Sequence, residues 1–203
     1  MPRLNSEDRG ELLPYHVYKR ANRGRAAFRD DADRDRFRDL IAGRLSRSHS
    51  NARPDGRPVR RVEGVDLFAM CLLRTHFHLV LWQKQEEAMR RLMQSVLTSY
   101  VMYFNRRYGT RGPLFSGPFE ARALKDPKDL RWAIAYVHCN DGSGPNYRYS
   151  THRAYVDPDQ APGWLNTRTP LKYFGGVDNY LDFLNGHNER AQLNERFFGS
   201  RYE

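Results

Sequence analysis

The sequence predicts an α+β domain built on an antiparallel sheet, because strand-like and helix-like hydrophobic patterns follow one another in a definite order. Seven segments carry these patterns: strands at 12–19, 65–73, 76–82 and 119–124, and helices at 31–47, 86–107 and 127–140. Too few residues separate the second and third strands for a crossover connection, so these strands are expected to form an antiparallel hairpin. Strand, helix, two strands, helix, strand and helix is an order typical of an α+β sandwich.

The first helix and the long central helix are expected to pack on the sheet. Segment 31–47 is a charged helix, and a basic loop rich in turn-forming residues follows it at 48–61. In segment 86–107 the apolar positions recur at helical spacing: Met89, Leu92, Met93, Val96 and Tyr100. Such a methionine-containing stripe is more often a core face than a cofactor site. A loop rich in glycine and proline at 109–118 then leads to the last strand.

The helix at 127–140 carries a candidate nucleophile. Its buried stripe consists of four residues at helical spacing: Leu130, Ala133, Ile134 and Val137. At 100 degrees per residue, Tyr136 and Asn140 lie together on one flank of this stripe and His138 lies on the other. Asn140 is therefore the better partner for chemistry at Tyr136, although a lone tyrosine beside a core helix usually serves packing.

The tripeptide His76-Phe77-His78 suggests a metal site. Side chains alternate along a strand, so both imidazoles project from one face while Phe77 projects from the other. Two adjacent neutral imidazoles can hold a divalent metal ion, whereas two polar residues on a solvated face are the simpler alternative. The combination with Tyr136 and Asn140 favours the metal hypothesis, since together they supply two nitrogen ligands, an oxygen ligand and a nucleophile.

Several motifs in order resemble the single-tyrosine HUH transposases, and within them the REP-associated tyrosine transposases. The resemblance covers about residues 12 to 155 and rests on these segments: Tyr15-His16-Val17, Thr75-His76-Phe77-His78-Leu79, Asn105-Arg106-Arg107, Arg111-Gly112-Pro113-Leu114-Phe115 and Tyr136-Val137-His138-Cys139-Asn140. Where the family usually has asparagine before the first histidine, this chain has Thr75. The resemblance implies a ferredoxin-like antiparallel sheet with packed helices, which is the HUH endonuclease fold.

The resemblance also implies a mechanism. In the family, two histidines and a polar helix residue hold magnesium or manganese, and a tyrosine attacks a phosphate of single-stranded DNA to leave a covalent 5′-phosphotyrosine. By position these roles fall on His76, His78 and Asn140 as metal ligands and on Tyr136 as the catalytic nucleophile. Imidazole suits manganese better than magnesium, which prefers oxygen ligands.

The composition independently points to an anionic partner. The chain has 203 residues and a net charge of +10, and 29 of its 34 basic residues are arginine, which favours bidentate phosphate contacts over point charges. A coding bias toward arginine would explain the choice over lysine but not the net excess. Arg106, Arg107 and Tyr108 at the end of the central helix, together with Arg111 in the following loop, are the expected DNA-binding residues.

The remaining features bound the organisation of the chain. Cys71 and Cys139 form neither a disulfide framework nor a zinc-finger pattern, and no signal core or membrane-spanning run is evident, so a cytoplasmic, nucleoid-associated protein is expected. Residues 1–155 are assigned to the transposase-like domain and 156–203 to an extension of short helices. Both a monomer and a homodimer are compatible with the sequence.

Three functions are compatible with the sequence. The leading hypothesis is a metal-dependent endonuclease and strand transferase acting on single-stranded DNA beside hairpins. The main alternative is a domesticated, non-catalytic DNA-binding protein, and a weaker one is an RNA-binding protein, because stacking surfaces do not by themselves distinguish the two sugars. The intact set of histidines, tyrosine and asparagine favours the enzyme.

Overall fold

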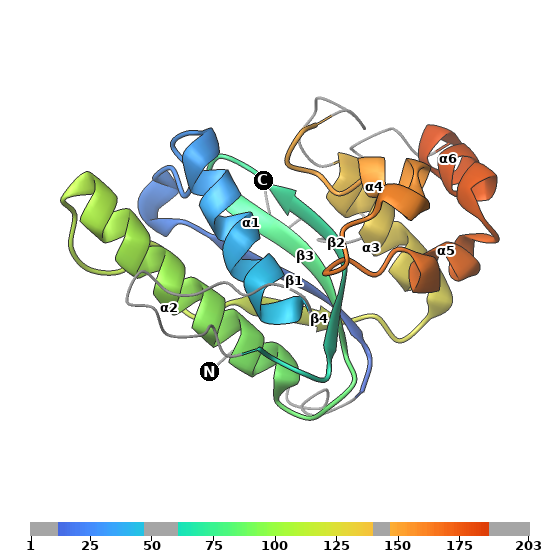
Figure 1. Ribbon diagram of the computed structural model, residues 1–203, viewed down its shortest axis with the longest axis horizontal. Helices are drawn as coiled ribbons and strands as arrows, with labels where there is room; N and C mark the ends of the chain where they lie inside the picture. The colour runs from blue at the N-terminus through green and yellow to red at the C-terminus, as the bar shows by residue number, and fades with distance from the viewer. Residues whose placement is uncertain (1–11, 47–60, 140–146, 187–203) are drawn as a thin grey trace.

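A four-stranded antiparallel sheet forms the centre of the protein. The computed structural model describes residues 12–46, 61–139 and 147–186 of the chain (Figure 1). The strands lie in the order β2-β3-β1-β4, and their bounds are Pro14–Arg20 for β1, Val65–Leu72 for β2, His76–Gln83 for β3 and Glu120–Ala123 for β4. All neighbouring pairs are antiparallel, and β2 and β3 form the expected hairpin.

The helices follow the order expected of a ferredoxin-like fold. Helix α1 (Asp31–Leu45) connects β1 to β2, and α2 (Ala88–Tyr108) connects β3 to β4. The helices after β4 are α3 (Pro127–Cys139), α4 (Arg153–Val156), α5 (Arg168–Phe174) and α6 (Val177–Gly186), and short 3-10 turns lie at Asn22–Gly24 (η1) and Pro158–Gln160 (η3). The predicted α+β class and antiparallel sheet are therefore confirmed.

Local sequence signals account for the ends of the two long helices. Asp30 caps the start of α1, where its side chain accepts a hydrogen bond from the backbone amide of Asp33 at 3.0 Å. Helix α2 is followed by the cap residue Gly109, whose φ of 62° is in the left-handed region that glycine adopts at helix ends.

Each face of the sheet supports its own hydrophobic core. Phe77, Leu79 and Leu81 of β3 pack with α1 and α2, whereas Val80 and residues of β2 pack with α3 and the later helices. Figure 1 shows α1 and α2 on one side of the sheet and α3 to α6 on the other. The alternation of β3 thus puts its two histidines on the face that α3 covers, where His78 is buried and His76 is half-buried.

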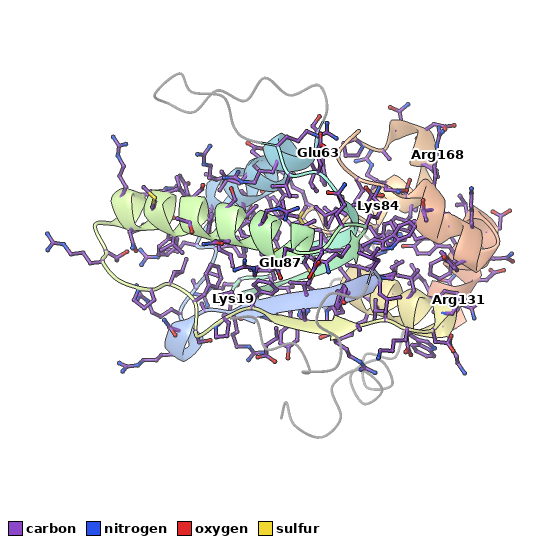
Figure 2. The ribbon with its side chains drawn as sticks, turned by 90° about the horizontal axis from the view of Figure 1, so that it is seen from below. Lys19, Glu63, Lys84, Glu87, Arg131 and Arg168 are labelled. Atoms are coloured by element: carbon purple, nitrogen blue, oxygen red, sulfur yellow. The ribbon has the colours of Figure 1, made fainter. Side chains whose placement is uncertain are left out.

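Residues 147–186 cover the β2 edge and pack against α3. The backbone amides of Thr151 and Asn166 donate to the carbonyls of Met70 and Leu67, both at 2.9 Å, so the segment satisfies polar groups along the exposed edge of the sheet. Between α3 and α6, the guanidinium of Arg131 lies 5.7 Å from the ring of Phe183 (Arg131 is labelled in Figure 2).

The domain boundary expected between residues 155 and 156 stays a prediction. No helix in the described ranges combines the length and hydropathy needed to cross a membrane.

The loop between α2 and β4 is held to the end of β1. Lys19, labelled in Figure 2, lies on the sheet face opposite the histidines, and its ammonium donates to the carbonyls of Ser116 and Gly117. Burial lowers the pKa of Lys19 to about 8. The backbone amide of Ser116 donates to the carbonyl of Arg20 at 3.2 Å. These contacts bring loop 109–118 to the strand end that also carries Arg20.

Candidate active site

Polar side chains gather on the sheet face that α3 covers. In the antiparallel register, Tyr18 of β1 pairs with His78 of β3, and Arg20 pairs with His76. On the other side of β1, His16 pairs with Arg122 and Tyr18 with Glu120. Alternate residues of three adjacent strands point to the same face, so this register creates one continuous polar patch. Its members are His16, Tyr18, Arg20, His76, His78, Glu120 and Arg122.

Two buried histidines at the centre of the patch are hydrogen-bonded to each other. Nε2 of His16 lies 3.0 Å from Nδ1 of His78, and the rings are nearly parallel, with 12° between their planes. Only 1% of His16 and 2% of His78 is exposed. Burial lowers the pKa of His16 to about 3, with the Arg122 charge adding to the effect. Burial also lowers the pKa of His78 well below its usual value, so both rings are neutral at pH 7.

His76 is held in a similar way at the edge of the patch. Its Nδ1 lies 2.8 Å from the hydroxyl oxygen of Thr75, and its ring centroid lies 5.0 Å from that of His78. In both His76 and His78, therefore, Nδ1 is bonded to a neighbouring side chain. Histidines that bind metals through one ring nitrogen commonly have the other nitrogen hydrogen-bonded in this manner. Two imidazoles with Nδ1 bonded in this way each have Nε2 left as the potential ligand atom, a donor type that suits manganese better than magnesium.

The two imidazoles supply only part of a coordination sphere. The described residues contain no group of three or more histidine, cysteine, aspartate or glutamate side chains close enough to bind one ion. The third predicted ligand, Asn140, lies outside the described residues. The metal site at His76, His78 and Asn140 therefore stays a prediction.

Tyr136 of α3 packs directly on the histidine pair. Its ring is nearly perpendicular to those of His78 and His16, at centroid distances of 5.2 Å and 5.6 Å, and only 6% of the residue is exposed. The phenol ring thus lies beside one predicted metal ligand, His78, although Tyr136 comes 58 positions after it in the chain. A tyrosine nucleophile and a phosphate-polarising ion would need this kind of proximity.

The fold is shared with a solved transposase structure. A REP-associated tyrosine transposase bound to a REP hairpin superimposes with a TM-score of 0.52 and 14% sequence identity, covering 77% of this chain and 86% of that chain. At this identity the likeness shows a common fold. No protein-family model and no curated protein sequence matches the chain.

His138 belongs to a different cluster from Tyr136. Its Nδ1 lies 2.7 Å from the Tyr180 hydroxyl and its Nε2 lies 3.0 Å from the Thr151 hydroxyl. Nδ1 of His152 contacts the same Tyr180 hydroxyl at 2.5 Å. His138 therefore joins α3 to the C-terminal segment and does not face the His76 and His78 pair.

Two of the predicted DNA-binding residues, Arg107 and Tyr108, hold two helices together. Arg107 pairs with Asp33 at 2.6 Å and with Asp30 at 2.7 Å, and the Tyr108 hydroxyl donates to Asp33 at 2.8 Å. Asp33 is fully buried, so these contacts fasten the end of α2 to the start of α1. Arg106, Arg107 and Arg111 are all exposed, but Arg107 is paired with two carboxylates, so Arg106 and Arg111 are the stronger candidates of the predicted set for contact with phosphate.

Sequence reasoning gave no role to His16, Tyr18 or Glu120. The Tyr18 hydroxyl donates a hydrogen bond to the Glu120 carboxylate, and the Tyr18 ring lies 5.8 Å from the ring of His78. Alternation along β1 would have predicted that His16 and Tyr18 share a face, since Tyr15 and Val17 are the apolar positions between them. It could not have predicted that this face meets His78, because the hydrogen bond between His16 and His78 joins residues 62 positions apart.

Proposed function

We propose that the protein cuts and rejoins single-stranded DNA through a covalent bond between Tyr136 and a 5′-phosphate. The observation that carries the proposal is the contact of the Tyr136 ring with His78, in a patch that also contains His76 and two arginines. The fold shared with a REP-associated tyrosine transposase supports it. DNA with a hairpin and single-stranded flanks is the proposed substrate.

The reaction exchanges one phosphate ester for another. The phenol oxygen of Tyr136 attacks phosphorus, the bond from phosphorus to the 3′-oxygen breaks, and the phenol proton is lost to solvent while the 3′-oxygen is protonated. Attack of a free 3′-hydroxyl on the phosphotyrosine reverses these steps and rejoins a strand. A divalent ion bound by His76, His78 and Asn140 would supply stabilisation of the charge on the phosphate.

Arginines at the rim of the patch suit phosphate binding. Arg20 is exposed and pairs across the strands with His76, which is half-buried, whereas His78 and Tyr136 are covered by protein. Arg122 is also exposed. It lies on β4, the strand that pairs with β1 on the side away from β3. A DNA strand would therefore approach from the Arg20 and His76 end, where guanidinium groups can pair with phosphate oxygens.

A non-catalytic DNA-binding protein is the second candidate. The burial of Tyr136 and His78, with 6% and 2% of their surfaces exposed, is also what a structural core would require. In that case the patch would only stabilise α3 on the sheet. The two candidates differ in one observable, which is the formation of a covalent protein–DNA bond.

Adduct formation in the presence of manganese tests the proposal. Labelled oligonucleotides with a short hairpin and single-stranded flanks of varied sequence should give a band that migrates with the protein on a denaturing gel. Tyr136→Phe should abolish this band while DNA binding persists. Tyr173→Phe is a matched control, because that tyrosine is 44% exposed on α5 and outside the patch. Binding without any adduct in the wild-type protein would favour the non-catalytic candidate.

A further inference from the structure

The bond between His16 and His78 restricts which nitrogen of His78 carries hydrogen. A neutral imidazole has one N–H and one unprotonated nitrogen. A hydrogen bond between two neutral rings therefore uses the hydrogen of one ring and the lone pair of the other. If His16 Nε2 donated, His78 would have to carry its own hydrogen on Nε2 and could not bind a metal there. If His78 Nδ1 donates to His16 Nε2 across the observed 3.0 Å, Nε2 of His78 carries no hydrogen.

The neighbouring histidine has the same arrangement. Nδ1 of His76 lies 2.8 Å from the Thr75 hydroxyl oxygen, which can accept a hydrogen bond from Nδ1–H. In that tautomer Nε2 of His76 is unprotonated. The two imidazoles of the tripeptide are thus each bonded at Nδ1 by a different side chain. Thr75 precedes His76 in the chain, whereas His16 comes from another strand, so its position depends on the fold.

His16 also contacts the proposed nucleophile. Its ring lies 5.1 Å from the His78 ring in a stacked arrangement and 5.6 Å from the Tyr136 ring in an edge arrangement. One buried side chain from β1 is therefore packed against residues of both β3 and α3. A change at His16 would alter the orientation of the His78 imidazole and the support of the phenol at once.

We propose that His16 is a positioning residue that accepts a hydrogen bond from Nδ1 of His78 and thereby fixes the tautomer in which Nε2 of His78 is unprotonated. His16 also holds Tyr136 beside the His78 ring. The inference rests on the proposed function for its chemical purpose. Its structural content is a statement about two ring nitrogens, and it can be measured without DNA.

The first test is the tautomer of His78 in the metal-free protein. Long-range ¹⁵N–¹H spectra of the full-length chain, with resonances assigned through His78→Gln, distinguish a hydrogen on Nδ1 from one on Nε2. We expect His78 to carry its hydrogen on Nδ1 and His16 on Nδ1 as well, because Nε2 of His16 is the acceptor. A His78 ring with hydrogen on Nε2 would overturn the proposal.

The second test is manganese affinity, measured by electron paramagnetic resonance of free Mn²⁺ in the absence of DNA. His16→Phe keeps a ring against Tyr136 but removes the acceptor nitrogen, and should weaken Mn²⁺ binding by about 10–100-fold, as loss of such an outer partner commonly does. His16→Gln offers an amide oxygen as acceptor and should recover part of that loss. Equal affinity for His16→Phe and wild type would overturn the proposal.

A second buried histidine provides the matched control. His152 is also buried but is bonded to Tyr180 in the C-terminal segment, so His152→Phe should leave Mn²⁺ affinity within about twofold of wild type. If His152→Phe and His16→Phe lose the same affinity, general loosening of the fold explains both and the proposal is wrong. Manganese binding that depends on His16, without any DNA adduct, would contradict the proposed function and leave the positioning role intact.

Discussion

The hydroxyl of Tyr180 in α6 lies 2.7 Å from Nδ1 of His138 in α3. His138 comes two positions after Tyr136, the proposed nucleophile. The same hydroxyl contacts His152, and because it has one hydrogen it donates to one imidazole and accepts from the other. All three side chains are buried. The last described helix is thus tied to the tyrosine helix by a satisfied polar network.

Tyr180→Phe should therefore destabilise the protein. The substitution keeps the ring but removes the shared hydroxyl, leaving two buried imidazoles each without one partner, at a cost of about 1–3 kcal/mol. Urea unfolding at pH 7 measures this difference. Tyr173→Phe on the exposed face of α5 is the control and should change the unfolding free energy by less than about 0.5 kcal/mol. Equal stability of the two variants would show that the network contributes nothing.

Stability should fall as the pH drops from 7 to 5. Burial lowers the pKa values of His16, His78 and His138 in the folded protein, whereas the unfolded chain protonates near pH 6.5. Below pH 6.5 the unfolded state binds more protons, so each neutral buried histidine reduces the free energy of unfolding by up to about 1.4 kcal/mol per pH unit. Urea unfolding at pH 7, 6 and 5 checks the slope, and a flat profile would mean that these rings are protonated in the folded protein.

Arg107→Ala should lower the melting temperature by several degrees, because it leaves the buried Asp33 carboxylate without its guanidinium partner. Arg106→Ala on the same helix is the control, since this exposed residue should leave the melting temperature near that of wild type. Differential scanning calorimetry of both variants measures the contrast. The opposite ranking would show that Arg107 is not a structural residue.

Arg106 should instead affect DNA affinity. If it contacts phosphate, the plot of log affinity for single-stranded DNA against log salt has a slope of roughly −0.7 per neutralised phosphate, and Arg106→Ala removes about one such increment for every sequence alike. Fluorescence anisotropy from about 50 to 200 mM salt measures the slope. Loss of preference at a single base with an unchanged slope would mean that Arg106 reads a base edge.

The two histidines of the tripeptide should behave differently on replacement. The sequence predicts that both point away from the core side of β3, so that either could be replaced without loss of the fold. Phe77 does face the α1 and α2 core, but His78 is buried under α3 against Tyr136. His78→Ala should therefore cost about 1–3 kcal/mol of stability, whereas His76→Ala, at a half-buried position, should cost less while abolishing DNA cleavage. Thermal melting alongside the cleavage assay separates the two effects.

Local periodicity was sufficient to predict much of the site. Alternation along β3 placed His76 and His78 on one face, and the helical repeat of α3 separated Tyr136 from His138. These inferences depend only on the geometry of one element. The basic, turn-rich loop predicted at 48–61 falls almost entirely outside the described residues and stays a prediction.

Relations between distant segments could not be predicted in this way. The contact of His16 with His78 depends on the β1 to β3 register, and the ion pair of Arg107 with Asp33 joins residues 74 positions apart. From the sequence alone, Arg107 is one more exposed arginine at a helix end. Its role changes only when the packing of α2 on α1 brings a buried carboxylate beside it.

The identity of the residue that carries DNA tests the central claim most directly. The protein should be incubated with a single-stranded substrate and manganese, digested with nuclease and trypsin, and analysed by tandem mass spectrometry. The expected product is peptide 132–148 with a nucleotide 5′-phosphate on Tyr136 and an unmodified Tyr147. A nucleotide on any other tyrosine, or cleaved DNA without any modified peptide, would contradict the account.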